Sequence, residues 1–353
     1  MTLAAGRPSA GALGALLVVV AACCFATLGP ISRFAADAGV GPLALVTWRA
    51  AVGATVVTLF LVAGHAAGVA TVGLRSLPVR DRWFLAAAAA ANTVLNLSVF
   101  VAFGRLSIAL VLLVFYTYPA LVAVASVAWF GERMDRLRWT ALGISLAGLA
   151  CVISSGAAIG TLDPLGIALA TLGALGQVFY VMAARYGFAR VPGPQAAALT
   201  MAGAAVLYVA MGVLIGGLPA LAAPLGRPDA AVLALTAGIV GAGIPTVCFI
   251  TGIRRLGAPR AAILATLEPV VGVGLAALLL GERPAELQLV GGALIILAAV
   301  LLQVRPTAAA EHEAVAAAEA RNDTTMDAGR SIAGHGSAAA QTTVSETRTT
   351  RPP

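Results

Sequence analysis

The sequence predicts an all-α integral membrane protein with ten transmembrane helices in two inverted repeats of five helices. Three observations predict it: a scarcity of charge, ten apolar stretches of membrane-spanning length, and an internal duplication. Of the 353 residues, 60% are hydrophobic and only 10% are charged, whereas about 25% are charged in soluble globular proteins. So few charged side chains cannot cover a surface in water, and we expect much of the surface to face lipid.

Ten stretches are apolar and long enough to cross a bilayer, which requires about 20 residues of helix. Lipid offers no hydrogen bonds to the backbone, so open spanning segments have to be α-helices. The predicted spans are Leu13–Ile31, Leu43–Val62, Trp83–Phe103, Ile108–Phe130, Trp139–Ser155, Leu165–Ala184, Ala196–Leu218, Ala230–Gly252, Ala261–Leu280 and Leu287–Val304.

The distribution of basic residues predicts the orientation of the chain. All 22 are arginines, which together with abundant Ala, Gly and Val indicates GC-rich coding and a bacterial source. If residues 1–12 are cytoplasmic, the loops on that side hold eleven arginines and the opposite loops hold four. Because basic loops stay inside, we expect both termini on the cytoplasmic side of the cell membrane. Lipid headgroups account for these arginines better than nucleic acid does.

The two ends of the chain need separate interpretation. Arg7, an apolar run and Val20-Ala21-Ala22-Cys23 resemble a lipoprotein signal cleaved before Cys23. The apolar run continues to Ile31, however, and cleavage would leave an odd number of spans, so we expect the first helix to be retained. Residues 305–353 lack apolar periodicity and are predicted to form a disordered cytoplasmic tail.

A duplication with an offset of 150 residues relates the two halves of the chain. Without a gap, it pairs Arg105-Leu106 with Arg255-Leu256, Pro119 with Pro269, and Gly131-Glu132-Arg133 with Gly281-Glu282-Arg283. The expected repeats are residues 13–155 and 163–304. Each contains five spans, an odd number, so the second copy must lie upside down relative to the first. Inverted repeats are typical of secondary transporters, which bind their substrate near the midplane between the repeats.

Each half thus has five predicted helices, a proline in the fourth, and a Gly-Glu-Arg motif twelve residues later. In these features the chain resembles the EamA branch of the drug/metabolite transporter superfamily, most closely from Ala261 through Glu268-Pro269 to Arg283. The first half has Tyr118-Pro119 where the family usually has Glu-Pro. The resemblance covers nearly the whole chain before the tail. It implies a transporter that exports amino acids, related metabolites or drugs, and it names no single substrate.

Two ionisable side chains lie inside predicted spans, where charge is costly and usually functional. Glu268 lies about 10 Å inside the ninth span at the rise of an α-helix. Its carboxylate could bind an amine or carry a proton, or it could support the helix that Pro269 interrupts. Arg49, in the second span, could pair with Glu268 or with a substrate carboxylate, although snorkelling to the nearby interface is the simpler interpretation.

The remaining candidates are polar or helix-breaking residues within spans. Pro119 and Pro269 each remove a backbone hydrogen bond, and helices interrupted at matching places in two halves indicate a binding site. Side chains that could line this site, or hold helices together instead, are Tyr116, Tyr118, Asn92, Asn96, Gln177 and Tyr180. The Gly-Glu-Arg motifs lie at span ends, and we expect helix-ending turns with local ion pairs there.

The sequence carries no recognisable catalytic or cofactor motif. We find no sequence motif for a metal-ligand cluster, a nucleophile elbow or a phosphate-binding loop. The four cysteines have no metal-site spacing. We therefore predict no catalytic residue, cofactor or metal, and partners limited to a small organic solute and the bilayer. Proton coupling and the oligomeric state stay open. The alternatives are a membrane-embedded enzyme, or a channel or scaffold. A channel or scaffold would account less well for the inverted duplication.

Overall fold

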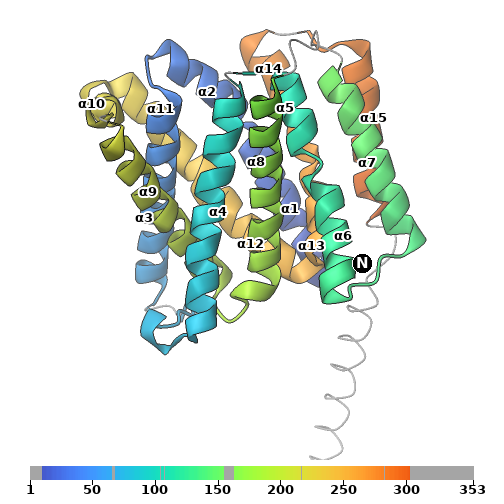
Figure 1. Ribbon diagram of the computed structural model, residues 1–353, viewed down its shortest axis with the longest axis horizontal. Coiled ribbons are helices and arrows are strands. Elements are labelled where there is room, and N and C mark those ends of the chain that lie inside the picture. The colour runs from blue at the N-terminus through green and yellow to red at the C-terminus, as the bar shows by residue number, and fades with distance from the viewer. Residues whose placement is uncertain are drawn as a thin grey trace, which may run out of the picture. The chain divides into compact units, whose positions relative to one another are not determined.

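The regular structure of the chain is entirely helical where the structure describes it. The computed structural model describes residues 10–65, 68–103, 105–106, 108–154, 163–215, 217–281 and 283–302. Within these ranges, eight helical segments are long and apolar enough to cross a membrane. Figure 1 shows helices from both halves of the chain packed side by side. The predicted class, an all-α membrane protein, is therefore confirmed. The predicted tail 305–353 and Glu282 lie outside the described residues.

The helices follow one another through short connections. In the first half they are α1 (Ala10–Ala26), α2 (Leu28–Asp37), α3 (Pro42–His65), α4 (Val79–Phe103), α5 (Ile108–Phe115), α6 (Tyr118–Phe130) and α7 (Arg136–Ser154). In the second half they are α8 (Pro164–Met182), α9 (Gly193–Leu214), α10 (Leu218–Ala222), α11 (Pro228–Gly238), α12 (Ile244–Leu256), α13 (Ala258–Ala265), α14 (Leu267–Leu280) and α15 (Glu286–Leu301). Two π-helical segments, η2 (Ala183–Gly187) and η4 (Ile239–Gly243), follow α8 and α11.

Several predicted spans differ from the observed helices. The third lies in α4, a helix of 25 residues, and the tenth overlaps α15, a helix of 16 residues; neither is among the eight segments. The fourth and ninth spans are each divided in two, into α5 with α6 and α13 with α14. The missing N–H of a proline ends a run of backbone hydrogen bonds, which explains why both divisions lie just before a proline.

The duplication is visible in the backbone as well as in the sequence. At the same offset of 150 residues, α5 corresponds to α13 over its full length. Gly131 ends α6 with φ 64°, and Gly281 ends α14 with φ 68°. Glycine adopts this left-handed conformation without steric cost and is therefore the usual residue at such a helix end.

Helices α7 and α15 pack closely in opposite directions. A methyl group on Gly148 would lie 2.6 Å from the carbonyl oxygen of Gly291 and 3.0 Å from Ile295, whereas one on Gly291 would meet Val152. Small residues permit such close contact between membrane helices. The earlier residue of α7, Gly148, meets the later residue of α15, Ile295, and the later residue of α7, Val152, meets the earlier residue of α15, Gly291. The two helices are therefore antiparallel. The loop before α7 and the loop before α15 consequently lie at opposite ends of the bundle, as Figure 1 also shows.

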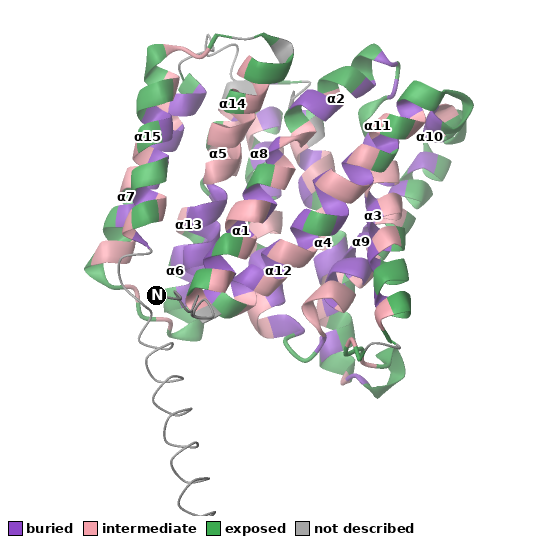
Figure 2. Ribbon diagram, turned by 180° about the vertical axis from the view of Figure 1, so that it is seen from behind, coloured by how far each residue is buried: buried purple, intermediate pink, exposed green. Residues whose placement is uncertain are grey.

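Large apolar side chains cover much of the outer surface. Figure 2 shows exposed residues along the outer faces of the helices and buried ones between them. Trp129 is 78% exposed and Leu278 is 82% exposed. Apolar side chains exposed in this number indicate a surface that faces lipid rather than water.

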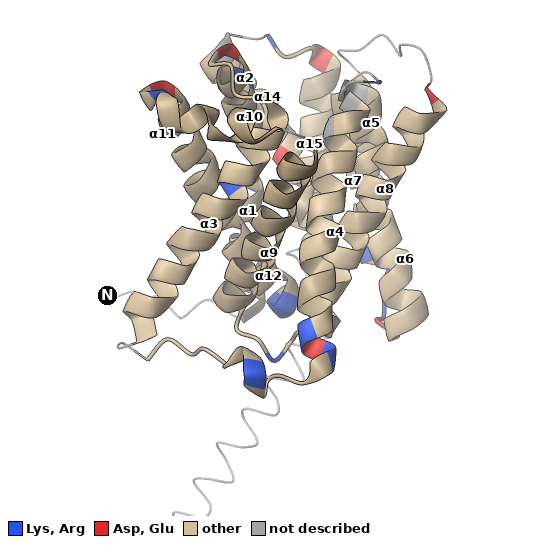
Figure 3. Cartoon of the chain, turned by 60° about the vertical axis from the view of Figure 1, so that its left-hand side comes forward, with Lys and Arg blue, Asp and Glu red and all other residues tan. Residues whose placement is uncertain are grey.

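Charge gathers near the ends of the helices. Figure 3 shows basic residues concentrated at the end that carries the α3–α4, α6–α7 and α8–α9 connections. We call this the arginine-rich end. It holds Arg75, Arg80, Arg82, Arg133, Arg136, Arg138, Arg185 and Arg190.

Candidate functional site

Two tyrosines and a carboxylate meet where the helices of both halves are interrupted. Glu268 lies in the first turn of α14, directly after the break that follows α13. Tyr116 lies in the corresponding break between α5 and α6, and its side chain lies close to the carboxylate of Glu268. The ring centroids of Tyr116 and Tyr118 are 6.0 Å apart. Since α6 packs against α13, the duplication brings its two interrupted spans together at this point.

Arg49 brings a guanidinium close to the carboxylate of Glu268. Nη1 of Arg49, about two turns into α3, donates to Oδ1 of Asn96 at 3.5 Å. The amide of Asn96 donates to the carbonyl oxygen of Asn92 at 2.7 Å. Arg49 is also close enough to Glu268 for the two charges to attract each other. The structure therefore turns the guanidinium of Arg49 toward Asn96 of α4 and toward Glu268.

Further aromatic hydroxyls surround these charges. The hydroxyl of Tyr208, on α9, donates to the carbonyl oxygen of Asn92 at 3.5 Å, and Tyr180, on α8, lies near Thr200. Both tyrosines lie within electrostatic reach of Arg49. We call the following eight residues the buried polar cluster: Arg49, Asn92, Asn96, Tyr116, Tyr118, Tyr180, Tyr208 and Glu268.

The exposure of the cluster differs between its charges and its rings. Tyr118 and Tyr208 are each 2% exposed, and Tyr116 is 4% exposed, whereas Arg49 and Glu268 are only half-buried. Arg49 interacts electrostatically with Tyr180 and Tyr208, and Glu268 interacts with Tyr116. Charges in mid-span are tolerated where they face a partner or water inside a bundle. The two charges of the cluster therefore have each other and neighbouring polar side chains as partners.

Not every predicted residue belongs to the cluster. Gln177 lies on α8, half-buried, and makes no hydrogen bond with a cluster residue in the described part of the chain. Pro119 and Pro269 lie in the first turns of α6 and α14, where they follow the breaks. Tyr208 was not among the predicted site residues. It is a polar aromatic residue within the seventh predicted span, and the same kind of signal identified Tyr180.

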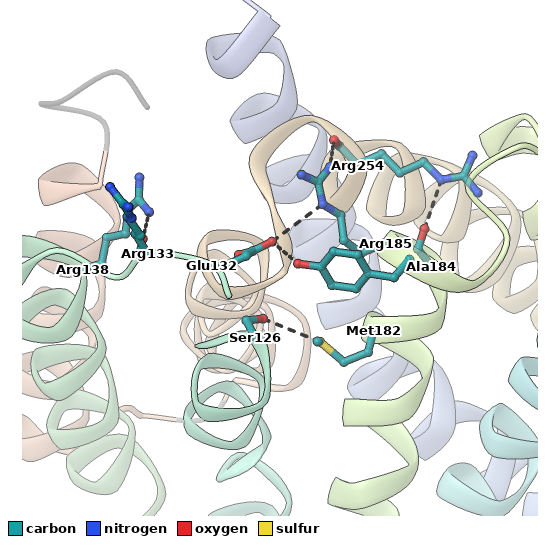
Figure 4. Close-up of polar contacts among 9 residues, drawn as sticks. Ser126, Glu132, Arg133, Arg138, Met182, Ala184, Arg185 and Arg254 are labelled. Atoms are coloured by element: carbon teal, nitrogen blue, oxygen red, sulfur yellow. Dashed lines mark hydrogen bonds and ion pairs between the residues drawn. The ribbon is translucent and has the colours of Figure 1, made fainter. Parts of the chain in front are cut away.

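A second polar network lies at the arginine-rich end. Glu132, in the loop after α6, accepts a hydrogen bond from the hydroxyl of Tyr186 and forms an ion pair with Arg185 at 3.8 Å (Figure 4). Arg185 and Tyr186 both belong to η2. The ring of Phe130 stacks on Tyr186 with the centroids 3.9 Å apart. The ion pair of this Gly-Glu-Arg motif is thus made with a distant helix, and the expectation of a purely local pair there was wrong.

Arginine side chains extend this network to α12. Arg185 donates to the carbonyl oxygen of Arg254. The guanidinium of Arg254 donates to the carbonyl oxygens of Ala184 at 3.1 Å, of Phe188 at 3.0 Å and of Val191. Carbonyl groups at a helix end have no partner within the helix, and here an arginine satisfies them. The contacts join the loop after α6, the segment after α8 and the end of α12, which we call the end network.

Comparison with known proteins agrees with the division into halves. The model of the EamA-like transporter family matches residues 12–154 and, separately, residues 164–304. A solved crystal structure of a protein shares 22% sequence identity with this chain and superposes with a TM-score of 0.69, covering 82% of this chain and 95% of its own. At this identity the likeness concerns the fold alone. No curated protein matches the sequence.

Proposed function

This chain belongs to the EamA-like transporter family, and we propose that it moves a small organic solute across the cytoplasmic membrane by alternating access. The two family matches correspond to the two halves of the duplication. Inverted halves of this kind typically rock against each other around a site near the midplane. The family is one of transporters, which favours this function over an enzyme.

The proposal includes ten spans, with α4 and α15 added to the eight segments of membrane length. Helix α4 is 25 residues long, and its apolar part begins after Arg82. Helix α15 packs against α7 along its length through the contact of Gly148 with Gly291. Ten spans place the arginine-rich end in the cytoplasm by the positive-inside rule, together with both termini.

The buried polar cluster is the proposed substrate site. The observation that carries this proposal is the proximity of Tyr116 to Glu268, because it brings together the interrupted helices of both halves. Interrupted helices at a repeat interface are the usual location of a transporter's binding site. The cluster offers a carboxylate from Glu268 and a guanidinium from Arg49, which suit a solute with an amine and a carboxylate. We therefore propose amino acids and related metabolites as substrates and export as the direction, with Glu268 available to carry a proton.

In this proposal, the end network indicates the side on which the described conformation is closed. It ties the segments after α6, α8 and α12 together at the arginine-rich end. If that end is cytoplasmic, the described conformation is closed toward the cytoplasm. Alternating access then requires the contacts of Glu132 with Arg185 and Tyr186 to break when the site opens inward.

Transport by the purified protein tests the proposal. Liposomes containing the chain and loaded with unlabelled amino acids are given the same ¹⁴C-labelled amino acids outside, and counterflow is measured against concentration. We expect saturable uptake that Glu268→Gln and Arg49→Ala reduce. Glu286→Gln, an exposed carboxylate in the first turn of α15, is the matched control and should transport normally. A flux that rises linearly with concentration would indicate a channel, and normal transport by both site variants would reject the proposed site.

A further inference from the structure

A small pocket lies at the arginine-rich end, apart from the buried polar cluster. Its volume is about 160 Å³, and it lies between the start of α4 and the segment that follows α8. The residues that give it chemical character are Arg80, Asp81, Tyr186 and Arg190. A pocket of this volume holds several water molecules, and so has room for a ligand group of several heavy atoms.

One carboxylate oxygen of Asp81, which lines this pocket, is buried without a hydrogen-bond donor among the described residues. Asp81 is 6% exposed, and within the described part of the chain its Oδ2 atom has no hydrogen-bond donor. The start of α4 favours a carboxylate electrostatically, but it does not supply that donor. A buried charged oxygen without a donor is destabilising. A positively charged group in the pocket would be attracted to this carboxylate and would offset part of the cost.

The rim of the pocket has the opposite charge. Arg80 and Arg190 are both exposed, and neither forms an ion pair with Asp81 among the described residues. The guanidinium of Arg80 lies 5.4 Å from the centre of the Phe84 ring, a cation–π contact that holds it at the rim. The pocket therefore presents a negative charge inside and two positive charges at its mouth.

We propose that this pocket binds a small zwitterion that carries a primary ammonium and, two carbons away, a phosphate or carboxylate. The ammonium meets Asp81, and the anionic group meets Arg80 and Arg190. A simple cation would be repelled by the two arginines, and a simple anion would be repelled by Asp81. Only a ligand with both charges, in this order from the inside outward, satisfies all three side chains.

Two sources can supply this chemistry: a phosphatidylethanolamine headgroup of the bilayer, or a free molecule such as O-phosphoethanolamine. Trp83, on the same turn of α4, is 71% exposed. Tryptophan is enriched at the level of lipid headgroups, so a lipid can reach this part of the protein. The pocket shares no residue with the buried polar cluster, so rejection of that substrate site would leave this proposal standing, although Tyr186 also belongs to the end network.

Thermal unfolding of the purified full chain in lipid-free detergent tests the proposal. We expect O-phosphoethanolamine to raise the melting temperature, because a ligand that binds only the folded state stabilises it. Phosphocholine, inorganic phosphate and ethylamine at equal concentration should have little effect, since each lacks the primary ammonium or one of the two charges. The same measurement in nanodiscs of phosphatidylethanolamine or phosphatidylcholine distinguishes the sources. Stabilisation by the lipid but not by the soluble headgroup would identify the bilayer as the source.

The variant Asp81→Asn provides the decisive comparison. It keeps the shape of the side chain and removes the charge, so the unliganded variant should fold. Its affinity for the zwitterion should fall by about tenfold or more, as for the loss of a charged hydrogen-bond partner. Asp229→Asn, an exposed carboxylate in the first turn of α11, should respond as the unmodified chain does.

Three results would overturn the proposal. They are equal stabilisation by inorganic phosphate alone, an unchanged response of Asp81→Asn, and no stabilisation by either source of the zwitterion. If Asp81→Asn fails to fold, the exposed pair Arg80→Gln and Arg190→Gln replaces it, and an unchanged response of that double variant would overturn the proposal equally.

Discussion

Tyr118 and Glu268 occupy equivalent positions in the two halves of the chain, 150 residues apart, and only one of them is an acid. Both lie in the first turn after a helix break, on α6 and α14. If position 118 also held an acid, its carboxylate would repel that of Glu268, and one of the two would have to be neutral. With a phenol on one side, the single charge of Glu268 faces Arg49 without a competing acid. The pseudo-symmetric backbone thus holds an asymmetric polar site.

Removal of the charge of Glu268 should impair transport more than removal of the hydroxyl of Tyr116. Glu268→Gln loses the attraction to Arg49 and to a substrate amine, and we expect counterflow to fall by about tenfold or more. Tyr116→Phe loses one polar interaction with Glu268, worth about 1 kcal/mol if it is like a typical hydrogen bond, which predicts a reduction of about fivefold. The concentration dependence of counterflow in liposomes measures both variants. Equal transport by Glu268→Gln and Tyr116→Phe would contradict this ranking.

Loss of the Glu132 contacts should open the arginine-rich end. Ser126 is fully buried on α6, next to Met182, with Oγ and Sδ 3.7 Å apart. A cysteine introduced there, in a chain whose four native cysteines are replaced, reports when this end opens. We expect Glu132→Ala to raise the rate of labelling by a maleimide about tenfold, since an ion pair and a hydrogen bond to a charged group are lost.

The control for this measurement is Asp135→Asn in the same loop, which keeps an oxygen to accept the hydrogen bond from the backbone N–H of Arg138 at 2.9 Å. Asp135 is exposed, and its ion pair with Arg138 is a local contact at 3.9 Å. Removal of that contact should leave the labelling rate of the introduced cysteine unchanged. A similar increase in both variants would show that the loop as a whole, rather than the contacts of Glu132, controls access.

The sequence predicted the parts of this molecule that depend on local chemistry. Apolar length predicted the helices, Pro119 and Pro269 predicted the breaks, and the cost of charge in lipid singled out Arg49 and Glu268. The end network could not be predicted in this way. Its contacts join residues such as Glu132 and Arg185 that are far apart in the chain, and they depend on how α6, α8 and α12 approach one another. Periodicity carries no information about that approach.

Gly148→Ala should destabilise the protein, whereas Gly143→Ala should not. Both glycines lie on α7, but a methyl group on Gly148 would lie 2.6 Å from a backbone oxygen of Gly291, and one on Gly143 would meet nothing within 4 Å. Overpacking against a rigid backbone costs about 1–3 kcal/mol, while alanine at an open helical position is favourable. Thermal unfolding in detergent measures the difference, and similar melting temperatures for the two variants would argue against the close contact of α7 with α15.

Asp163 should stabilise the start of α8 in a manner that depends on pH. Its carboxylate accepts hydrogen bonds from Nη1 of Arg105 at 2.8 Å and from the backbone N–H of Leu165 at 2.9 Å. The contact with Arg105, followed by that with Leu165, lowers the pKa of Asp163 below its ordinary value. A lowered pKa in the folded state means that stability is present above the unfolded pKa, about 3.9, and is lost as the pH falls through the folded value.

The variant Asp163→Asn isolates this charge, because asparagine also caps helices well. We expect the variant to melt at a lower temperature than the unmodified chain at pH 6 and the difference to shrink as the pH falls below about 4. Melting curves across this range measure it. A difference that stays constant with pH would attribute the effect to shape rather than to charge.

The loops at Asp135 and Arg283 should be labelled from opposite sides of the membrane. Helices α7 and α15 begin after these loops and are antiparallel, so a chain that spans the membrane must expose the two loops on different sides. Single cysteines at the two exposed positions, in a chain without its native cysteines, are treated with an impermeant maleimide in sealed vesicles of known orientation. We expect Asp135→Cys to react only from the cytoplasmic side and Arg283→Cys only from the other. Arg283→Cys removes a basic residue from the outer side, which strengthens the positive-inside bias, so reaction of both cysteines from one side would contradict the inverted halves on which alternating access depends.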